Sequence, residues 1–67
     1  MRVDPEQISN LRKARQARGL TQERMAARLR VSLGWYALLE REPSFLSERI
    51  AKRAASLLGC RPEELLP

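Results

Sequence analysis

Histidine is absent from this 67-residue sequence, and cysteine occurs only once, at position 60. A lone cysteine cannot form an intrachain disulfide, and without histidine the residues of a typical zinc site are missing. The most common general bases and nucleophile–base pairs are missing as well. We therefore expect no metal or other cofactor, no small-molecule site and no enzymatic activity.

Long apolar segments are also lacking. Crossing a membrane takes about 18 consecutive apolar residues, and the sequence contains no such run. Residues 1–6 do not have the apolar stretch of a secretory signal peptide. A single cysteine without a secretion signal is typical of the reducing cytoplasm, so we expect a soluble cytoplasmic protein that makes no membrane contact.

The shortness of the chain limits the core that it can form. Its 67 residues suffice for one domain, which we take to span residues 1–67. A domain of about this size buries only about 60% of the surface that its unfolded chain exposes, so its stability should be modest. Association with a second copy is the remaining external support, and we expect a homodimer.

Positive charge is plentiful and unevenly distributed. Thirteen Lys and Arg residues against eight Asp and Glu give a net charge of +5. Residues 1–30 hold eight of these cations and three acids, whereas residues 31–67 hold five of each sign. Eleven of the cations are arginine, whose planar guanidinium suits phosphate oxygens. A basic half beside a neutral half favours a nucleic-acid partner, although an arginine-rich solvated surface would have the same composition.

Helix caps and stop signals divide the chain into five short helices. Asp4-Pro5-Glu6-Gln7 has the pattern of a capping box with proline at the first helical position. Thr21 and Ser32 are expected to cap the second and third helices, and Ser44 or Ser47 the fourth. The first, third and fourth helices are expected to end at Gly19, Pro43 and Gly59. The segment Arg61–Leu66 is expected to form the last helix.

Apolar residues at helical spacing predict which side chains form the core. The segment Pro43–Leu46 is expected to be a loop with two apolar anchors, Phe45 and Leu46. The expected inward-facing residues are Ile8, Leu11, Ala14, Arg15, Met25, Ala26, Leu29, Tyr36, Leu39, Ile50, Ala54, Leu57 and Leu58. No alternating strand pattern is present, so the sequence predicts a compact all-α bundle.

The segment from Thr21 to Glu40 has the pattern of two short helices joined by a tight turn. Ala26 lies where the helices would cross, and a small residue there permits close approach. Several ordered pieces resemble the Cro/repressor-type (Xre-like) helix-turn-helix family: Leu20-Thr21-Gln22, Met25-Ala26, Val31-Ser32, Leu39-Glu40 and the closing segment 58–66. The resemblance covers roughly residues 8–66.

This resemblance implies a five-helix, lambda-repressor-like fold with a helix-turn-helix over about residues 21–42. It also implies sequence-dependent binding of double-stranded DNA by a transcriptional regulator, which we expect to be a repressor. In such proteins the second helix of the motif enters the major groove. Dimers in this family often form through the last helices, and Leu65-Leu66 can serve this contact or cover the core.

Matching positions to the family gives candidate site residues. Gln22 corresponds to a glutamine that hydrogen-bonds a DNA phosphate. Arg15 and Glu40 correspond to a structural ion pair that joins the first helix to the end of the third. Ser32 can reach a phosphate or only cap its helix, and Trp35 can donate its indole N–H to a phosphate or wedge against the fourth helix. Charge and location add four further candidates for phosphate or groove contacts: Arg24, Arg28, Arg30 and Arg41.

The family's base-reading positions fall on Leu33, Gly34, Ala37 and Leu38. None of these side chains has a hydrogen-bond donor or acceptor, whereas direct reading of guanine or adenine normally uses Arg, Asn or Gln. The three larger side chains can contact thymine methyl groups, and Gly34 can let the backbone come close to a base. Specificity can instead come from Arg41, Arg49 or DNA shape.

Arg30 occupies the position of a frequent turn glycine, so a left-handed conformation there would be strained.

The apolar row of Leu33, Ala37 and Leu38 beside Trp35 also suits a second function, docking of another protein on the same fold.

Overall fold

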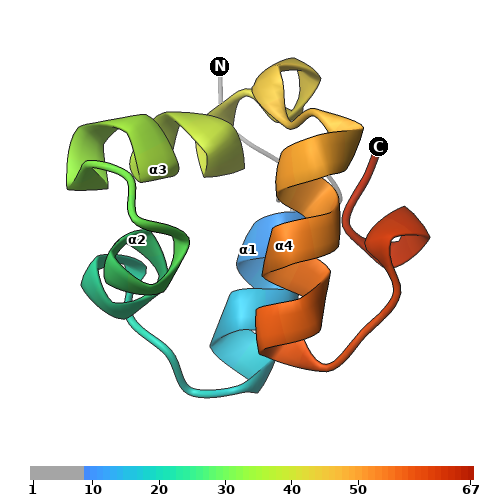
Figure 1. Ribbon diagram of the computed structural model, residues 1–67, viewed down its shortest axis with the longest axis horizontal. Helices are drawn as coiled ribbons and strands as arrows, with labels where there is room; N and C mark the ends of the chain where they lie inside the picture. Colours follow the sequence, from blue (N-terminus) through green and yellow to red (C-terminus); the bar gives the residue numbers. More distant parts are fainter. Residues whose placement is uncertain (1–8) are drawn as a thin grey trace, which may run out of the picture.

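The computed structural model describes residues 9–67, which form four α-helices and two short 3-10 turns (Figure 1). The helices are α1 (Asn10–Ala17), α2 (Gln22–Leu29), α3 (Leu33–Arg41) and α4 (Glu48–Leu58). The turns are η2 (Pro43–Phe45), between α3 and α4, and η3 (Pro62–Glu64), after α4. No strand occurs within residues 9–67, so the all-α prediction is confirmed for this part of the chain.

The prediction of a fifth helix is wrong. Pro62 does begin a helical turn, but the segment closes with i→i+3 bonds, from the Glu64 N–H to the Arg61 carbonyl and from the Leu65 N–H to the Pro62 carbonyl. Directly after this turn Leu65 is buried in the core. The segment is therefore a single 3-10 turn, the form that short helical pieces commonly take.

Helix α1 begins later than the sequence suggests. Ser9 has an extended backbone (φ −61°, ψ 151°), and its hydroxyl accepts a hydrogen bond from the Arg12 N–H at 3.1 Å. Ser9 is thus the N-cap, and α1 begins at Asn10. The predicted cap at residues 4–7 lies outside the described residues, as does Ile8.

The other predicted caps are confirmed. The hydroxyls of Thr21, Ser32 and Ser47 each accept a hydrogen bond from the N–H three residues further on, at 3.1, 3.1 and 3.2 Å. Of the two serines proposed for α4, Ser47 is the cap. Each cap satisfies one of the N–H groups that a helix start leaves unpaired.

Three helices end with the same backbone motif. Gly19, Arg30 and Gly59 have left-handed conformations (φ 68°, 61° and 72°). In each case the following residue donates its N–H to the carbonyl five residues back, as Val31 does to Ala26 at 3.0 Å. These are Schellman-type ends, which favour glycine at the left-handed position. The strained conformation expected at Arg30 is therefore present.

Two arginines close helix ends across the fold. Arg53 of α4 donates from Nη2 to the Leu29 carbonyl at the end of α2, at 2.7 Å. Arg18 donates from Nε to the Leu58 carbonyl at the end of α4. A cation at the C-terminus of a helix also opposes the negative end of the helix dipole. Arg18, one of the cations of the basic half, therefore serves the fold.

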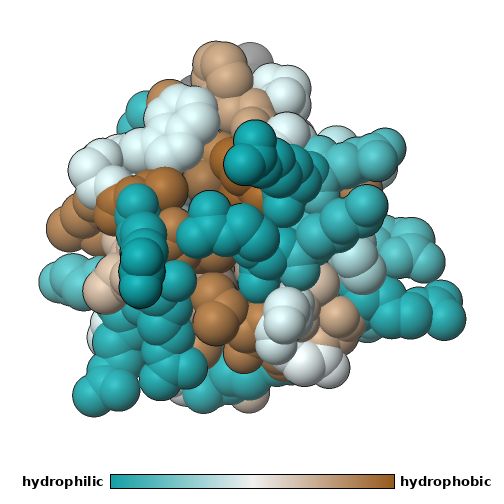
Figure 2. Space-filling view, viewed as in Figure 1, coloured by the Kyte–Doolittle hydropathy of each residue, from teal (hydrophilic) through white to brown (hydrophobic). Residues whose placement is uncertain are grey.

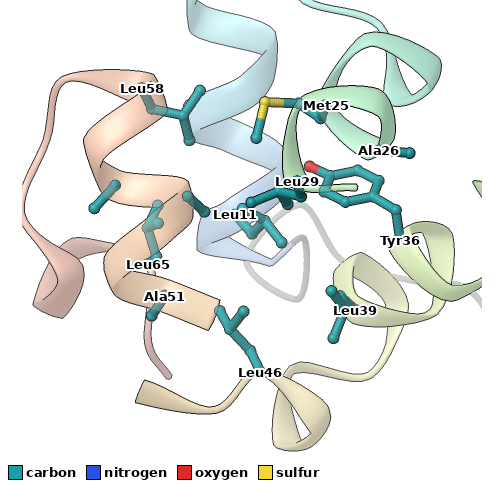
Figure 3. Close-up of a cluster of buried hydrophobic side chains, with 12 residues drawn as sticks. Leu11, Met25, Ala26, Leu29, Tyr36, Leu39, Leu46, Ala51, Leu58 and Leu65 are labelled. Atoms are coloured by element: carbon teal, nitrogen blue, oxygen red, sulfur yellow. The ribbon is translucent and has the colours of Figure 1, made fainter. Parts of the chain in front are cut away.

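The core lies where α1, α2, α3 and α4 meet, and it is closed by Leu46 and Leu65, the residues directly after η2 and η3 (Figure 3). The ring of Tyr36 extends from α3 toward α2, where Met25 and Leu29 are fully buried (Figure 3). Helix α4 contributes mainly small side chains, Ala51, Ala54 and Ala55, together with Leu58. These small residues allow the neighbouring helices to approach α4 closely.

Two expected core residues are exposed instead. Leu57 lies beside the inward positions 51, 54, 55 and 58 of α4, and 38% of its surface is accessible to solvent. Phe45 is 50% exposed, so Leu46 is the only buried anchor of the segment 43–46. Both errors have the same cause: an apolar residue next to the buried stripe of a helix or turn does not itself have to be buried.

Among residues 9–67, no helix combines the length and the apolar character that a membrane-spanning helix requires.

Replacing Arg30 with glycine should raise the free energy of unfolding by about 1 kcal/mol. A left-handed conformation costs an L-residue roughly 1–2 kcal/mol, and the greater chain entropy of glycine offsets part of that gain. Thermal melting should detect this as a rise of about 4–8 °C. Arg30→Lys keeps both charge and strain and should melt like the wild type, whereas a lower melting temperature for Arg30→Gly would contradict the prediction.

Candidate nucleic-acid interface

Helices α2 and α3 contact each other across a three-residue connection, Arg30-Val31-Ser32. Figure 1 shows α2 nearly end-on where α3 is seen lengthwise, so the two helices cross instead of running side by side. The crossing is close because Ala26 is buried. Val31 packs against the core and donates its N–H to the Ala26 carbonyl. The local backbone thereby fixes the direction in which α3 leaves α2.

Glu40 joins three helices through its side chain. Arg15 of α1 donates from Nε to Glu40 Oε2 at 2.6 Å and from Nη2 to Glu40 Oε1 at 3.3 Å. Gln22, the first residue of α2, donates from Nε2 to Glu40 Oε1 at 3.0 Å. Arg15 also donates from Nη1 to the Leu20 carbonyl at 2.6 Å, which holds the α1–α2 connection. The ion pair expected from the family resemblance is thus present as part of a larger network.

The network is almost entirely shielded from water. The side chains of Arg15 and Glu40 are only 9% and 3% exposed. Burial alone would raise the pKa of Glu40, but the hydrogen bonds from Arg15 and Gln22, together with the charge of Arg15, outweigh it and hold the pKa below its ordinary value. The hydrogen bond to Glu40 raises the pKa of Arg15 in turn, even though burial opposes this. Both groups are therefore charged at neutral pH.

Gln22 lies half-buried at the N-terminus of α2. Its bond to Glu40 uses one N–H of the amide, and this bond orients the side chain. The second N–H and the amide oxygen take part in no hydrogen bond within residues 9–67. The side chain is therefore held by the fold and still has hydrogen-bonding capacity beside the start of α2.

One face of α3 carries the four predicted base-facing residues. Leu33 and Gly34 are exposed, and Ala37 and Leu38 are half-buried. Because residues three and four positions apart are neighbours on a helix, these four form one continuous apolar surface. A Cβ atom added at Gly34 would meet nothing within 4 Å. We call Leu33, Gly34, Ala37 and Leu38 the apolar face of α3.

Four exposed cations lie on α2, on the turn that follows it and at the end of α3. Arg24, Arg28, Arg30 and Arg41 are all exposed, and none of them forms an ion pair within residues 9–67. Arg24 and Arg28 are four positions apart on α2, a spacing at which like charges destabilise a helix by roughly 0.2–0.5 kcal/mol. Figure 2 shows hydrophilic and apolar surface next to each other on the side of the molecule that carries α2 and α3.

Ser32 and Trp35 have contacts of their own within the protein. The Ser32 hydroxyl accepts the Trp35 N–H as the cap of α3. The Trp35 ring packs against Phe45 of η2, with ring centroids 6.0 Å apart and planes inclined by 53°, and remains 37% exposed. Trp35 therefore stands at the edge of α3, with an aromatic partner that the sequence analysis did not anticipate.

The sequence model of the helix-turn-helix family matches residues 11–65. The chain belongs to the Cro/repressor-type helix-turn-helix family. Members of this family are DNA-binding regulators of transcription, so α2, the turn at Arg30–Ser32 and α3 are the helix-turn-helix motif of this protein. No curated protein and no solved structure is significantly similar to the chain.

Some residues that position the helix-turn-helix were not found from the sequence. The resemblance pointed to Arg15 and Glu40 as a pair but to Gln22 only as a phosphate ligand, and its bond to Glu40 was missed. Arg18 and Arg53 entered the sequence analysis only through the charge totals, although they bond helix ends 40 and 24 residues away. Nothing in the local sequence of either arginine indicates these long-range bonds.

Replacing Glu40 with alanine should lower the free energy of unfolding by about 3–5 kcal/mol, because Arg15 would keep its buried charge without a partner. Chemical denaturation with urea measures this loss. Glu42→Ala removes an exposed carboxylate two residues away and should change stability by less than about 0.5 kcal/mol. An unchanged melting temperature for Glu40→Ala would refute the structural role of the network.

The network should also make stability depend on acid. Because the pKa of Glu40 is lower in the folded state than its ordinary value of 4.5, its contribution is complete above that pH and is lost as the pH falls through the folded value. Wild-type protein should therefore be more stable than Glu40→Gln at neutral pH, and the difference should shrink below about pH 4.5. Urea unfolding of both proteins at a series of pH values tests this, and a difference that is independent of pH would contradict it.

Proposed function

We propose that this protein binds double-stranded DNA in a sequence-dependent manner and represses transcription from the sites that it occupies. The observation that carries this proposal is the α2–α3 motif itself. Its second helix is held in a fixed direction by Glu40 and has a solvent-accessible apolar face, and the motif carries exposed cations that form no ion pair within residues 9–67. A helix presented in this way can enter the major groove while the surrounding charges contact phosphates.

Contacts to the DNA backbone are assigned to the ends of the two helices. Gln22 and the free N–H groups at the start of α2 suit a phosphate oxygen, because a helix N-terminus attracts anions. Arg24, Arg28, Arg30 and Arg41 supply the long-range attraction. Ser32 and the indole N–H of Trp35 are the remaining candidates for phosphate contacts. The apolar face of α3 then lies toward the bases.

We further propose that the protein acts as a homodimer in the cytoplasm. Two copies related by a twofold axis would place their α3 helices in successive major grooves, about 34–36 Å apart. Leu65 is buried in its own chain and is not available for this contact, whereas Leu66 is half-buried. Sedimentation over a range of concentrations tests the dimer, and a monomer mass at every concentration would exclude it.

The DNA-binding proposal is tested by measuring affinity for random-sequence duplexes and for a duplex pool enriched by selection, each at several salt concentrations. Phosphate contacts predict an affinity that falls steeply with salt. Enrichment of a twofold-symmetric sequence would support an operator-binding dimer and give the spacing of its half-sites. Salt-sensitive binding without enrichment would contradict the sequence-dependent part.

The exposed aromatic pair Trp35 and Phe45 favours one rival function, docking of another protein on this surface. The same experiment separates the two functions, because apolar docking does not depend on counterion release. Absence of DNA binding even at low salt would exclude the proposed function and favour this rival.

Shortening Leu38 to alanine should reduce discrimination between the selected and the random duplex more than it reduces binding to the random duplex. The reason is that Leu38 faces the bases, whereas random-sequence binding depends on charge. Competition binding with both duplexes measures the ratio. As a control, Leu57→Ala makes the same chemical change on α4 and should leave the ratio unchanged. If Leu38→Ala unfolds the domain, Leu38 belongs to the core and the prediction is wrong.

A further inference from the structure

The apolar face of α3 differs chemically from a surface that reads bases by hydrogen bonds. Leu33 is 45% exposed, and Gly34, Ala37 and Leu38 complete a surface that carries no side-chain nitrogen or oxygen. The polar residues beside it are already engaged: Ser32 caps the helix, and Glu40 is buried in its network. Exposed polar groups appear on this helix only at Arg41, its last residue, and at the indole N–H of Trp35.

The major groove offers few groups that suit such a surface. Most of the base edge consists of hydrogen-bond donors and acceptors, and covering these with apolar atoms leaves them without partners at a considerable cost. The C5-methyl group of thymine is the apolar exception among the normal bases. Cytosine methylated at C5 carries the same group at the equivalent position of its ring. An apolar surface on α3 therefore favours bases that carry the C5-methyl group of a pyrimidine, and it disfavours base edges that expose only polar groups.

The shape of the face agrees with this chemistry. Gly34 has open space where a side chain would project, since a Cβ atom there would have no neighbour within 4 Å. Its neighbours on the helix surface are Ala37 and Leu38, three and four positions further on. Without a side chain at Gly34, the backbone of α3 can come close to a base edge beside Leu38.

Resting on the proposed DNA binding, we propose that the apolar face of α3 recognises the C5-methyl groups of pyrimidines in the major groove, those of thymine and 5-methylcytosine alike. The exposed cations of α2, the turn and the end of α3 hold the duplex through its phosphates. Discrimination then depends on the number and position of methyl groups that Leu33 and Leu38 cover. Since each contact is apolar, each methyl group raises the affinity for DNA by only a modest factor.

Four duplexes of equal length, in two pairs, test this, because all carry the same phosphate charge and the two members of a pair differ only in the methyl group. They are alternating dA–dT, its deoxyuridine counterpart, alternating dG–dC, and its 5-methylcytosine counterpart. The wild-type protein should bind the methylated member of each pair more tightly, by roughly fourfold for each methyl group contacted. Equal affinity within both pairs would overturn the inference while leaving the proposed function intact.

Three variants separate contact with the methyl group from changes in duplex stiffness. Leu33→Ala should lower the methyl preference, whereas Leu57→Ala, on a leucine of similar exposure, should keep it. Leu57 lies in the last turn of α4, the end of that helix away from α3 (Figure 1). Gly34→Ala adds a methyl group that meets nothing within the protein but would hold α3 further from the base edge. It should therefore lower the preference while the domain stays folded, as circular dichroism would verify.

A methyl preference that persists in Leu33→Ala and in Gly34→Ala would belong to the DNA itself and would overturn the inference. Failure of the wild-type protein to bind any of the four duplexes at low salt would overturn the proposed function, and the inference would fall with it.

Discussion

The buried carboxylate of Glu40 is the interaction on which this structure depends most. It lies on α3 and accepts hydrogen bonds from Arg15 of α1 and Gln22 of α2, so three of the four helices of residues 9–67 meet at one side chain. Burying a charge costs free energy unless its partners are fixed in place. Arrangements of the three helices that separate Glu40 from Arg15 and Gln22 are therefore unfavourable. The same contact holds Gln22 at the start of α2, where the proposed phosphate contact lies. Fold and interface are thus coupled through one residue.

The arginines of this chain divide into two groups with different tasks. Arg15, Arg18 and Arg53 bond Glu40 or the carbonyls at helix ends and replace some of the support that a small core does not supply. Arg24, Arg28, Arg30 and Arg41 remain exposed and unpaired within residues 9–67. Arg30 even occupies a left-handed position that favours glycine. Strain and like-charge repulsion that persist on one surface are typical of a site whose partner is absent.

Local features of this fold could be predicted from the sequence, and long-range ones could not. The caps Thr21 and Ser32 and the stops at Gly19 and Gly59 depend on a few neighbouring residues, and they were predicted correctly. Leu57 and Phe45 were misplaced because a helical or turn pattern identifies an apolar side and leaves the final position of each residue to tertiary packing. The fifth helix was wrong because Pro62 starts a helical turn but does not determine its length. The bond between Gln22 and Glu40 required knowledge of how α2 meets α3.

The most direct test of the interface is an NMR titration of the labelled protein with duplex DNA, following every backbone amide. DNA bound by the helix-turn-helix should shift or broaden the signals of Gln22, Leu33 and Gly34, and it should leave Leu57 and Gly59 unchanged. Signals that move around Leu57 while Gly34 stays unchanged would contradict the assignment of the interface to α2 and α3.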